Sequence, residues 1–319
     1  TPASSAPTAP AHFNQTRTPD GIATMTEGTL PSRDRTQRFI FEEADIRGEI
    51  VQLDDSYRDL VSVHQYAPGV NRLVGEFLSA AVLLATTLKF DGRLVLQARS
   101  EGQVPLLMAE CDSDLNLRAI ARGAQEATSD RFGQLLTGGQ LAITIDPTSG
   151  KRYQGIVPLV EDSLARSLDA YFLQSEQLGT RFWLACDGER AAGMLLQQLP
   201  AQLVEDNGQR SAQWEHVNAL ATTLQPDELL SVSAPELVHR LYHEDPIRLF
   251  EPVPARFHCN CSRERTLNAL SSLPREEVRD LLEELGSITM DCEFCNQQYR
   301  FVERDLSDIL ENDGAGTLH

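Results

Sequence analysis

Lysine is almost absent from this chain: Lys89 and Lys151 are the only two among 28 basic residues, and 47 acidic residues outnumber the basic ones. The formal net charge is therefore −19. Nucleic-acid binders gain much of their affinity by neutralising phosphates, so this balance argues against a nucleic-acid partner. It argues equally against binding to an anionic membrane surface.

A long hydrophobic run is also missing. The longest, residues 77–88, is bounded by Glu76 and Lys89, whereas a membrane-spanning helix needs about 20 apolar residues. The N-terminal stretch lacks the basic segment followed by an apolar one that a secretory signal requires. We therefore expect a cytoplasmic protein with no membrane partner. In that reducing compartment, cysteines are typical of metal-binding or redox-active sites rather than of structural disulfides.

The 319 residues are enough for about two domains. Residues 1–36 are rich in proline, serine, threonine and alanine, so we expect a disordered tail there. Residues 37–203 combine runs of strands with segregated helices, which predicts an α+β core domain. Residues 204–252 are predicted to form a helical linker, and residues 253–319 a small C-terminal domain.

Apolar periodicity and turn residues predict the elements of the core. The first two expected strands flank Gly48, and the first expected helix is apolar around its whole circumference, so it should be buried. The predicted elements are strands at 39–41, 50–53, 94–98, 106–109, 141–145, 153–157 and 181–185, a turn at 90–93, and helices at 70–88 and 162–174.

The linker is predicted to consist of short helices that are only marginally stable alone. A helix over 211–224 places Trp214, Val217 and Leu220 on one face, which we expect to dock on another part of the protein. A second helix is expected where Ser233 and Glu236 form a capping-box pattern.

Four of the six cysteines are clustered as Cys-x-Cys, thirty residues, then Cys-x-x-Cys. Zinc prefers four soft ligands in a tetrahedron, and two close pairs of thiolates supply them. We expect one zinc ion per reduced chain. A single helix over 273–285, with Gly286 after its end, is predicted between the pairs. The proposed ligands are Cys259, Cys261, Cys292 and Cys295.

Two interpretations of this cluster stay open at this point. It is either a purely structural zinc site or a redox switch, because the sulfurs within each pair are close enough in sequence to oxidise locally. Structural zinc contributes on the order of 10–16 kcal/mol to small domains. A disulfide across a three-residue loop contributes only about 1.6 kcal/mol of stability. Oxidation would therefore remove the main stabiliser, which favours a switch that unfolds when oxidised.

Several segments between residues 37 and 310 match a known family pattern. They are residues 258–265 (HCNCSRER), 291–295 (DCEFC), 86–92 (TTLKFDG), 152–155 (RYQG), 193–197 (GMLLQ) and 240–244 (RLYHE). With these segments the sequence resembles the redox-regulated thirty-three-kilodalton heat-shock protein family, the bacterial holdase chaperones. The N-terminal tail departs from the pattern of that family.

The resemblance implies an N-terminal mixed α+β core, a metastable helical linker and a small C-terminal zinc-binding redox-switch domain. It implies an inactive, zinc-bound monomer when reduced. Oxidation is expected to release zinc and unfold the linker, after which a homodimer holds unfolding client proteins without ATP. The disulfides that the resemblance implies are Cys259–Cys261 and Cys292–Cys295.

The resemblance also gives the linker face a second role. When the linker detaches, the face that carries Trp214, Val217 and Leu220 becomes a surface for clients. The two remaining cysteines, Cys111 and Cys186, are expected to be free and buried. His258 is expected to be a surface residue, because four thiolates already complete the zinc shell.

Two alternative functions remain. One is a thiol-disulfide oxidoreductase that uses Cys292 and Cys295, although the thioredoxin-like βαβ pattern of such enzymes is not visible. The other is a zinc-binding regulatory protein of transcription or translation, which the net charge opposes. The sequence has no nucleophile elbow, phosphate loop or zinc-protease helix, so we expect no enzymatic activity.

Overall fold

The structure is a computed structural model of the full chain, and it describes residues 33–87, 91–160, 162–175 and 178–311. The chain divides into two units, residues 1–32 and residues 33–319, and the elements below belong to the second. Most of the expected disordered tail lies outside the described residues. The first sheet begins before the predicted end of the tail at residue 36, because Arg35 and Thr36 pair with Gln52 and Val51.

The first sheet joins strands from distant parts of the chain in the order β10-β1-β2-β9-β8, with β11 also paired to β1. Gly48 lies inside β2 rather than between two strands, and it is opposite Phe39. A β-carbon at Gly48 would lie 2.0 Å from the Phe39 ring, so the glycine makes room for that ring. The strands are β1 Arg35–Phe41, β2 Ile46–Leu53, β8 Thr180–Cys186, β9 Ala191–Gln198, β10 Ile247–Leu249 and β11 Val253–Pro254.

The second sheet has the order β12-β5-β4-β3-β6-β7. Its strands run antiparallel to their neighbours, except for β12, which is parallel to β5. The expected hairpin is confirmed as β6 and β7, while the expected turn at 90–93 lies partly outside the described residues. The strands are β3 Gly92–Arg99, β4 Leu106–Asp112, β5 Asn116–Arg122, β6 Gln140–Pro147, β7 Tyr153–Pro158 and β12 Arg256–Phe257.

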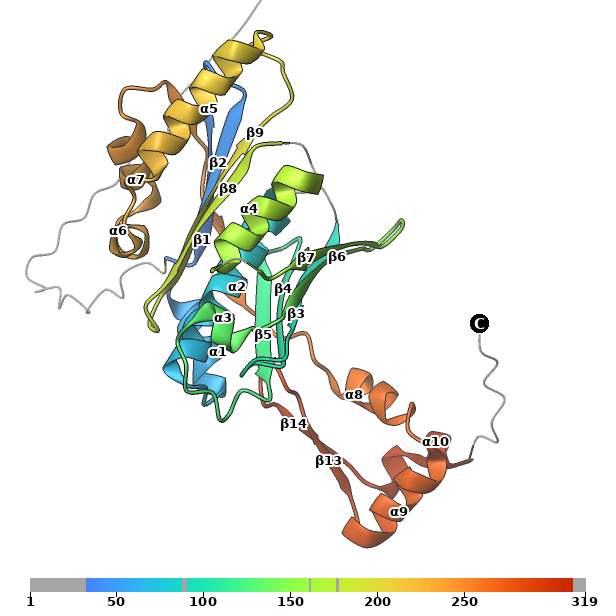
Figure 1. The fold of residues 1–319 in the computed structure, drawn as a ribbon. Helices are drawn as coiled ribbons and strands as arrows, with labels where there is room; N and C mark the ends of the chain where they lie inside the picture. Colours follow the sequence, from blue (N-terminus) through green and yellow to red (C-terminus); the bar gives the residue numbers. More distant parts are fainter. Residues whose placement is uncertain (1–32, 88–90, 161, 176–177, 312–319) are drawn as a thin grey trace, which may run out of the picture. The chain divides into compact units, whose positions relative to one another are not determined.

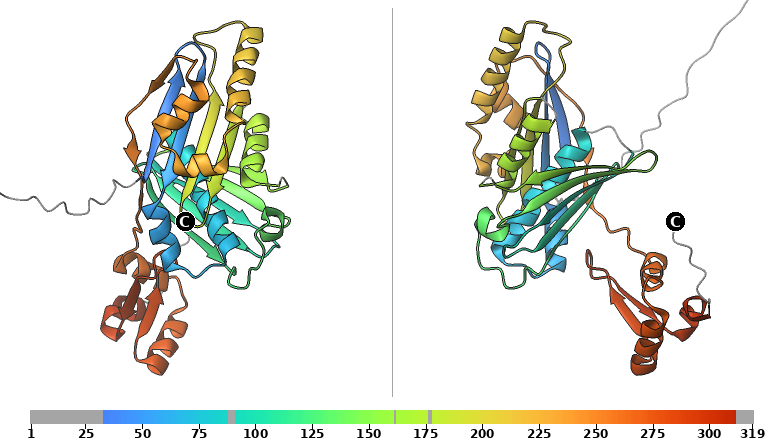
Figure 2. Two further views of the ribbon diagram at one scale, coloured as in Figure 1. Left: turned by 90° about the vertical axis from the view of Figure 1, so that its left-hand side faces the viewer. Right: turned by 45° about the vertical axis from the view of Figure 1, so that its right-hand side comes forward.

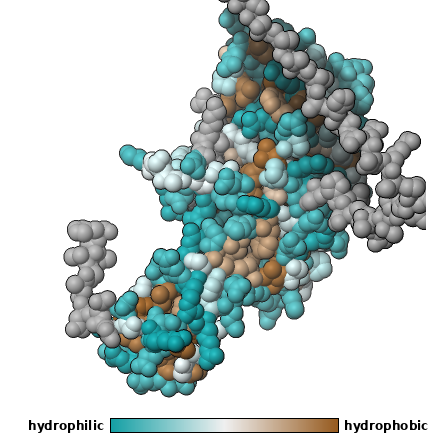
Figure 3. Space-filling model, turned by 180° about the vertical axis from the view of Figure 1, so that it is seen from behind, coloured by the Kyte–Doolittle hydropathy of each residue, from teal (hydrophilic) through white to brown (hydrophobic). Residues whose placement is uncertain are grey.

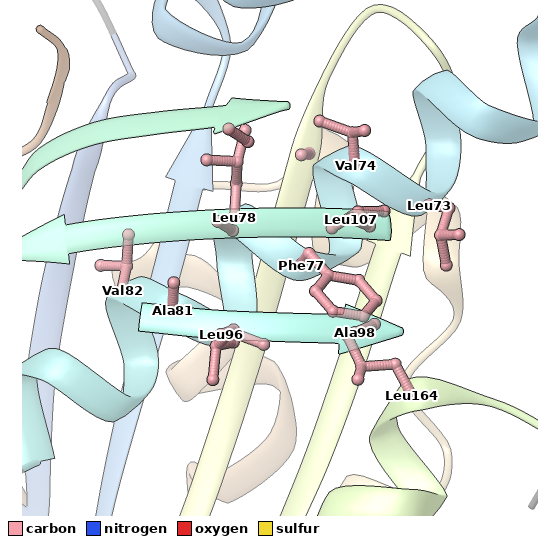
Figure 4. Close-up of a cluster of buried hydrophobic side chains, with 14 of the residues drawn as sticks. Leu73, Val74, Phe77, Leu78, Ala81, Val82, Leu96, Ala98, Leu107 and Leu164 are labelled. Carbon is pink, nitrogen blue, oxygen red and sulfur yellow. The ribbon is translucent and has the colours of Figure 1, made fainter. Parts of the chain in front are cut away.

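Helix α2, Pro68–Thr87, is the central element of the core. By length and composition it could cross a membrane, but most of it is buried inside the protein. It contacts β2, β8 and β9 of the first sheet and β3, β4 and β5 of the second. Figure 4 shows Phe77 and Leu78 of this helix beside Leu96 and Leu107 of the second sheet. The prediction of a buried helix is confirmed, because both sheets cover its apolar circumference.

Three further helices complete this part of the chain: α1 Asp55–Val63, α3 Phe132–Leu135 and α4 Leu164–Ser175. Helix α4 corresponds to the helix predicted at 162–174 and packs on β8. Helices α1 and α3 and the strands β5 and β9 have no counterpart among the predicted elements. The two sheets and α2 form one continuous hydrophobic cluster.

Three short helices cover the opposite face of the first sheet (Figures 1 and 2): α5 Asn207–Ala221, α6 Pro226–Ser231 and α7 Ala234–Tyr242. Val217 is 1 % exposed, whereas Trp214 and Leu220 are only partly buried against the same cluster. The largest side chain that these helices bury is Tyr242, which is 2 % exposed and packs against Phe39 and Phe41.

Polar contacts also hold these helices to the sheet. The side-chain amide of Gln52, on β2, donates hydrogen bonds of 3.1 Å to the Leu229 carbonyl and 2.7 Å to the Val232 carbonyl. The predicted capping box does not form: Ser233 precedes α7, but its side chain makes no capping hydrogen bond. A proline in the first turn of α7 supplies the helical backbone angle there without such a cap.

Residues 258–311, here called the C-terminal module, contain two helices between the cysteine pairs, not the single one predicted. Gly286 ends the second helix in the left-handed conformation (φ +68°), as predicted. Six residues form the module's small hydrophobic core: Leu270, Val278, Leu282, Ile288, Phe301 and Leu306. On the face shown in Figure 3, hydrophilic residues cover most of the module. The elements are α8 Arg263–Leu270, α9 Arg275–Leu285, β13 Ile288–Asp291, β14 Gln298–Phe301, η1 Glu303–Asp305 and α10 Ser307–Glu311.

The mixed α+β class is confirmed. The division into core, linker and C-terminal domain stays a prediction, and the strand pairings add detail to it. Residues 247–254 return to β1 through β10 and β11, and residues 256–257 pair with β5 through β12. The chain that leads from the linker to the module therefore runs along both sheets.

Candidate thiol centre

The four clustered cysteines converge in the C-terminal module, where their sulfur atoms all lie within 4.8 Å of one another. Two close sulfur contacts join the two pairs: Cys259 Sγ lies 3.6 Å from Cys292 Sγ, and Cys261 Sγ lies 3.4 Å from Cys295 Sγ. All four side chains are partly buried thiols with no disulfide between them. Four soft donors at these distances could hold a metal ion.

The second pair is presented by the tight turn that joins β13 to β14. The Cys292 N–H donates to the Gln297 carbonyl at 2.9 Å, and the Asn296 N–H donates to the Cys292 carbonyl at 2.7 Å. Asn296 adopts a left-handed conformation (φ +54°), which asparagine tolerates better than most residues. This turn points both sulfurs to the same side of the hairpin.

The first pair is held between a strand and a helix. The His258 N–H donates to the Leu117 carbonyl of β5 at 3.0 Å, just before Cys259. After Cys261, the Ser262 hydroxyl accepts a 3.1 Å hydrogen bond from the Arg265 N–H and caps α8. The Cys-x-Cys segment is therefore fixed at one end by a backbone hydrogen bond to β5 and at the other by the side-chain cap of α8.

The thiols differ in how readily they ionise. Burial raises the pKa of Cys259, and burial with hydrogen bonds from neighbouring thiols raises the pKa of Cys295. Burial also opposes ionisation of Cys261, but the Tyr299 hydroxyl, which donates at 3.1 Å, and the other thiols lower the pKa of Cys261 below its usual value. Cys261 is therefore the first of these three thiols to ionise.

The other residues singled out from the sequence lie apart from this centre. Cys111 is fully buried in β4, and burial raises the pKa of its thiol. Cys186 is partly buried in β8, and burial raises its pKa to about 11. Neither thiol is in a reactive environment. His258 is exposed, and it does not belong to the cluster of metal-ligating atoms found among the described residues.

Three residues around the thiols were missed by sequence reasoning: Arg118, Phe294 and Tyr299. Arg118 lies on β5, and its Nη1 atom is 4.0 Å from Cys259 Sγ. Its guanidinium carbon lies 4.1 Å from the centroid of the Phe294 ring. The 141 positions that separate Arg118 from Cys259 in sequence leave no local pattern that links them.

A centre of four convergent thiols in a small module, attached to an α+β body, defines a metal-binding or redox-active thiol protein. The family model described as Hsp33 protein matches residues 34–302. The chain therefore belongs to the Hsp33 family, and the predicted resemblance to a chaperone family is confirmed.

Known relatives agree with this assignment. A 33 kDa chaperonin from Pseudomonas savastanoi pv. phaseolicola is 52 % identical over 289 residues, which cover 90 % of this chain and 96 % of that protein. A 33 kDa chaperonin from Pseudomonas aeruginosa is 52 % identical over 287 residues, which cover 89 % and 96 %. The solved structure of a 33 kDa chaperonin from Thermotoga maritima has a TM-score of 0.74 at 20 % identity, covering 87 % of this chain and 98 % of that one, and it supports the fold.

Proposed function

We propose that this protein is a redox-regulated, ATP-independent holdase, which binds unfolding proteins once its thiol centre is oxidised. The observation that carries the proposal is the convergence of four cysteines from two separate segments within 4.8 Å, in a chain of the Hsp33 family. The proposal assigns no enzymatic reaction to the protein.

In the reduced state, the four clustered cysteines would hold one zinc ion. Zinc–sulfur bonds of 2.3 Å place the sulfurs of a tetrahedral site about 3.8 Å apart. The separations of 3.6 Å and 3.4 Å across the two pairs support this fit. Zinc would supply much of the free energy that folds the module, because the hydrophobic core of the module contains only six buried residues.

Oxidation would close two disulfides, Cys259–Cys261 and Cys292–Cys295. Each pair of metal-bound thiolates would give up two electrons to one molecule of hydrogen peroxide, which takes two protons from the solvent and becomes two molecules of water. Sulfurs in a disulfide no longer carry the thiolate charge that a metal ligand needs. Zinc would therefore leave, and the module would lose its main source of stability.

Release of helices α5 to α7 would then expose apolar surface. In the reduced fold these helices share a hydrophobic cluster with the first sheet, and this cluster includes Val217 while Trp214 and Leu220 pack at its edge. Detachment would present both the helix face and the sheet face to water, and such surfaces bind unfolded chains. We propose that the oxidised protein forms a homodimer through such surfaces and that the reduced protein is a monomer.

The proposed setting is the cytoplasm, where reducing conditions keep the four thiols available for zinc. The net charge of −19 supports a function without nucleic acid or an anionic membrane surface.

The experiment is light scattering of a thermally unfolding client, with reduced and peroxide-treated protein compared. The oxidised protein should suppress aggregation, and the reduced protein should not. The Cys111→Ser/Cys186→Ser double variant is the matched control, and it should activate like the wild type. Full zinc retention by the Cys261→Ser/Cys292→Ser variant, or equal protection in both redox states, would contradict the proposal.

A further inference from the structure

We propose that strand β5 is the docking surface of the C-terminal module and that Arg118 on this strand is a positioning residue of the thiol centre. Arg118 holds both cysteine segments in the arrangement of the reduced protein. It therefore sets the rate at which the centre releases zinc and exposes its thiols. This inference rests on the proposed redox function and adds a residue, outside the cysteines, that governs it.

Arg118 uses three sides of one guanidinium group. Its Nη2 lies 2.7 Å from a Glu110 carboxylate oxygen, and its Nη1 donates a 2.8 Å hydrogen bond to the Asn260 side chain. Its planar face stacks on the Phe294 ring. The Arg118 and Glu110 side chains are only 14 % and 8 % exposed. One rigid group therefore joins the core to a residue inside each cysteine pair.

The residues that make these contacts stand between the cysteines. Asn260 separates Cys259 from Cys261, while Glu293 and Phe294 separate Cys292 from Cys295. Glu293 forms an ion pair with Arg122, which is also on β5. Next to the second pair, the Asn296 side chain donates a 2.7 Å hydrogen bond to the Val63 carbonyl at the end of α1.

Closing a disulfide within a pair must reshape these connecting residues. Disulfide sulfurs are about 2.05 Å apart, far closer than two thiolates that share a metal. The short loops of one and two residues would have to move to allow this change, and they carry the contacts to Arg118 and Arg122. Docking on β5 and oxidation of the pairs are therefore coupled, and by linkage each opposes the other.

A lysine could not replace Arg118 fully. A guanidinium is planar and can donate to a carboxylate at one edge and to an amide oxygen at another while an aromatic ring packs on its face, whereas an ammonium is a compact point charge. Arg118→Lys should therefore retain only part of the coupling. Arg93 provides the matched control, because it also pairs with Glu110, at 3.3 Å, and belongs to the same sheet.

The test uses the full-length, reduced, zinc-loaded protein. Zinc release to a chromogenic chelator is followed at fixed peroxide and temperature, and thiol modification is followed separately without oxidant. Arg118→Leu should accelerate both rates about tenfold, the scale expected from losing a cation–π contact with a charged hydrogen bond. Arg118→Lys should fall between this variant and the wild type, and Arg93→Leu should stay within about twofold of the wild type.

Phe294→Leu gives an independent test from the other side of the contact. It should accelerate zinc release, and combining it with Arg118→Leu should add little, because both variants remove the same interaction. Wild-type rates in a folded Arg118→Leu protein, or fully additive effects, would overturn the inference. If Arg118→Leu does not fold, wild-type rates in Phe294→Leu overturn it instead.

The two proposals fail in different ways. Wild-type protein that binds no zinc, or protects no client after oxidation, contradicts the proposed function. If the wild type binds zinc and protects clients after oxidation, but Arg118→Leu and Phe294→Leu release zinc at the wild-type rate, only the role of β5 is contradicted.

Discussion

The Asp45 carboxylate is bound to Arg210 by a 2.7 Å ion pair, and the two side chains are only 5 % and 12 % exposed. The same carboxylate accepts hydrogen bonds from the backbone N–H groups of Gln202, Leu203 and Val204. Arg210 in turn donates a 2.6 Å hydrogen bond to the Leu199 carbonyl. The turn between β1 and β2 therefore fastens the segment that enters α5.

Removing this anchor should free the start of the helical linker. Asp45→Ala leaves the Arg210 charge without its buried partner, and breaking a buried pair typically costs about 3–5 kcal/mol. We expect faster protease cleavage and hydrogen exchange between residues 199 and 210 in the reduced protein. Glu236→Ala is the control, because its ion pair with Arg240 is exposed and worth at most about 1 kcal/mol. If residues 199–210 are equally protected from exchange and cleavage in the two variants, Asp45 does not anchor this segment.

Tyr242 should matter more than Trp214 for docking of the linker. Tyr242 is buried between Phe39 and Phe41, whereas Trp214 is only partly buried. Tyr242→Ala should cost about 3–5 kcal/mol and increase dye-accessible apolar surface in the reduced protein, while zinc stays bound. Trp214→Ala should have a smaller effect of the same kind.

Tyr242→Phe isolates the contribution of the tyrosine hydroxyl. The hydroxyl donates a 3.3 Å hydrogen bond to the Val217 carbonyl, so its loss should cost only about 1 kcal/mol. Dye binding and protease digestion rank the three variants. The order is contradicted if Trp214→Ala exposes the linker more than Tyr242→Ala does.

Glu76 should make stability depend on pH between about 4.5 and 7. Burial raises the pKa of this α2 carboxyl from 4.5 to about 7, although Arg72 opposes the shift. The folded protein therefore holds a proton that the unfolded chain loses in this range, so the free energy of unfolding falls as pH rises. Between pH 4.5 and 8, the free energy of unfolding of Glu76→Gln should rise relative to that of the wild type by on the order of 2–3 kcal/mol. Thermal unfolding at several pH values measures this difference, and a constant difference would exclude the effect.

Removing zinc from the reduced protein should unfold the C-terminal module selectively. The module has its own small hydrophobic core, while the two sheets and α2 form a much larger one. After treatment with a strong chelator, hydrogen exchange should lose protection across residues 258–311 and retain it in α2. Loss of protection throughout the protein in one step would contradict separate stabilisation.

Gly48→Ala should destabilise the first sheet. The added methyl group would lie 2.0 Å from the Phe39 ring, and overpacking of this kind costs about 1–3 kcal/mol. Gly133→Ala is the matched control, because beyond its chain neighbours and the backbone of its own helix a β-carbon there would meet no described atom within 4 Å. Urea denaturation gives both values, and equal midpoints would show that Phe39 moves aside without cost.

The sequence alone was sufficient to predict the cysteine centre and the buried helix. The spacing of Cys259, Cys261, Cys292 and Cys295 is a local pattern, since short turns bring the members of each pair together whatever surrounds them. The apolar circumference of residues 70–88 likewise predicts burial, because an exposed helix needs a polar face. The stop of α9 at Gly286 follows from the left-handed conformation that glycine tolerates.

Only the tertiary structure decided which distant residues meet. Strands β5 and β9 escaped prediction, and β5 supplies Arg118, whose partners Asn260 and Phe294 lie on segments far along the chain. The burial of the Tyr242 side chain also depends on the sheet beneath it rather than on the periodicity of its own helix. Such contacts depend on how sheets and helices pack over the whole chain, and a local pattern of apolar and polar residues does not determine that packing.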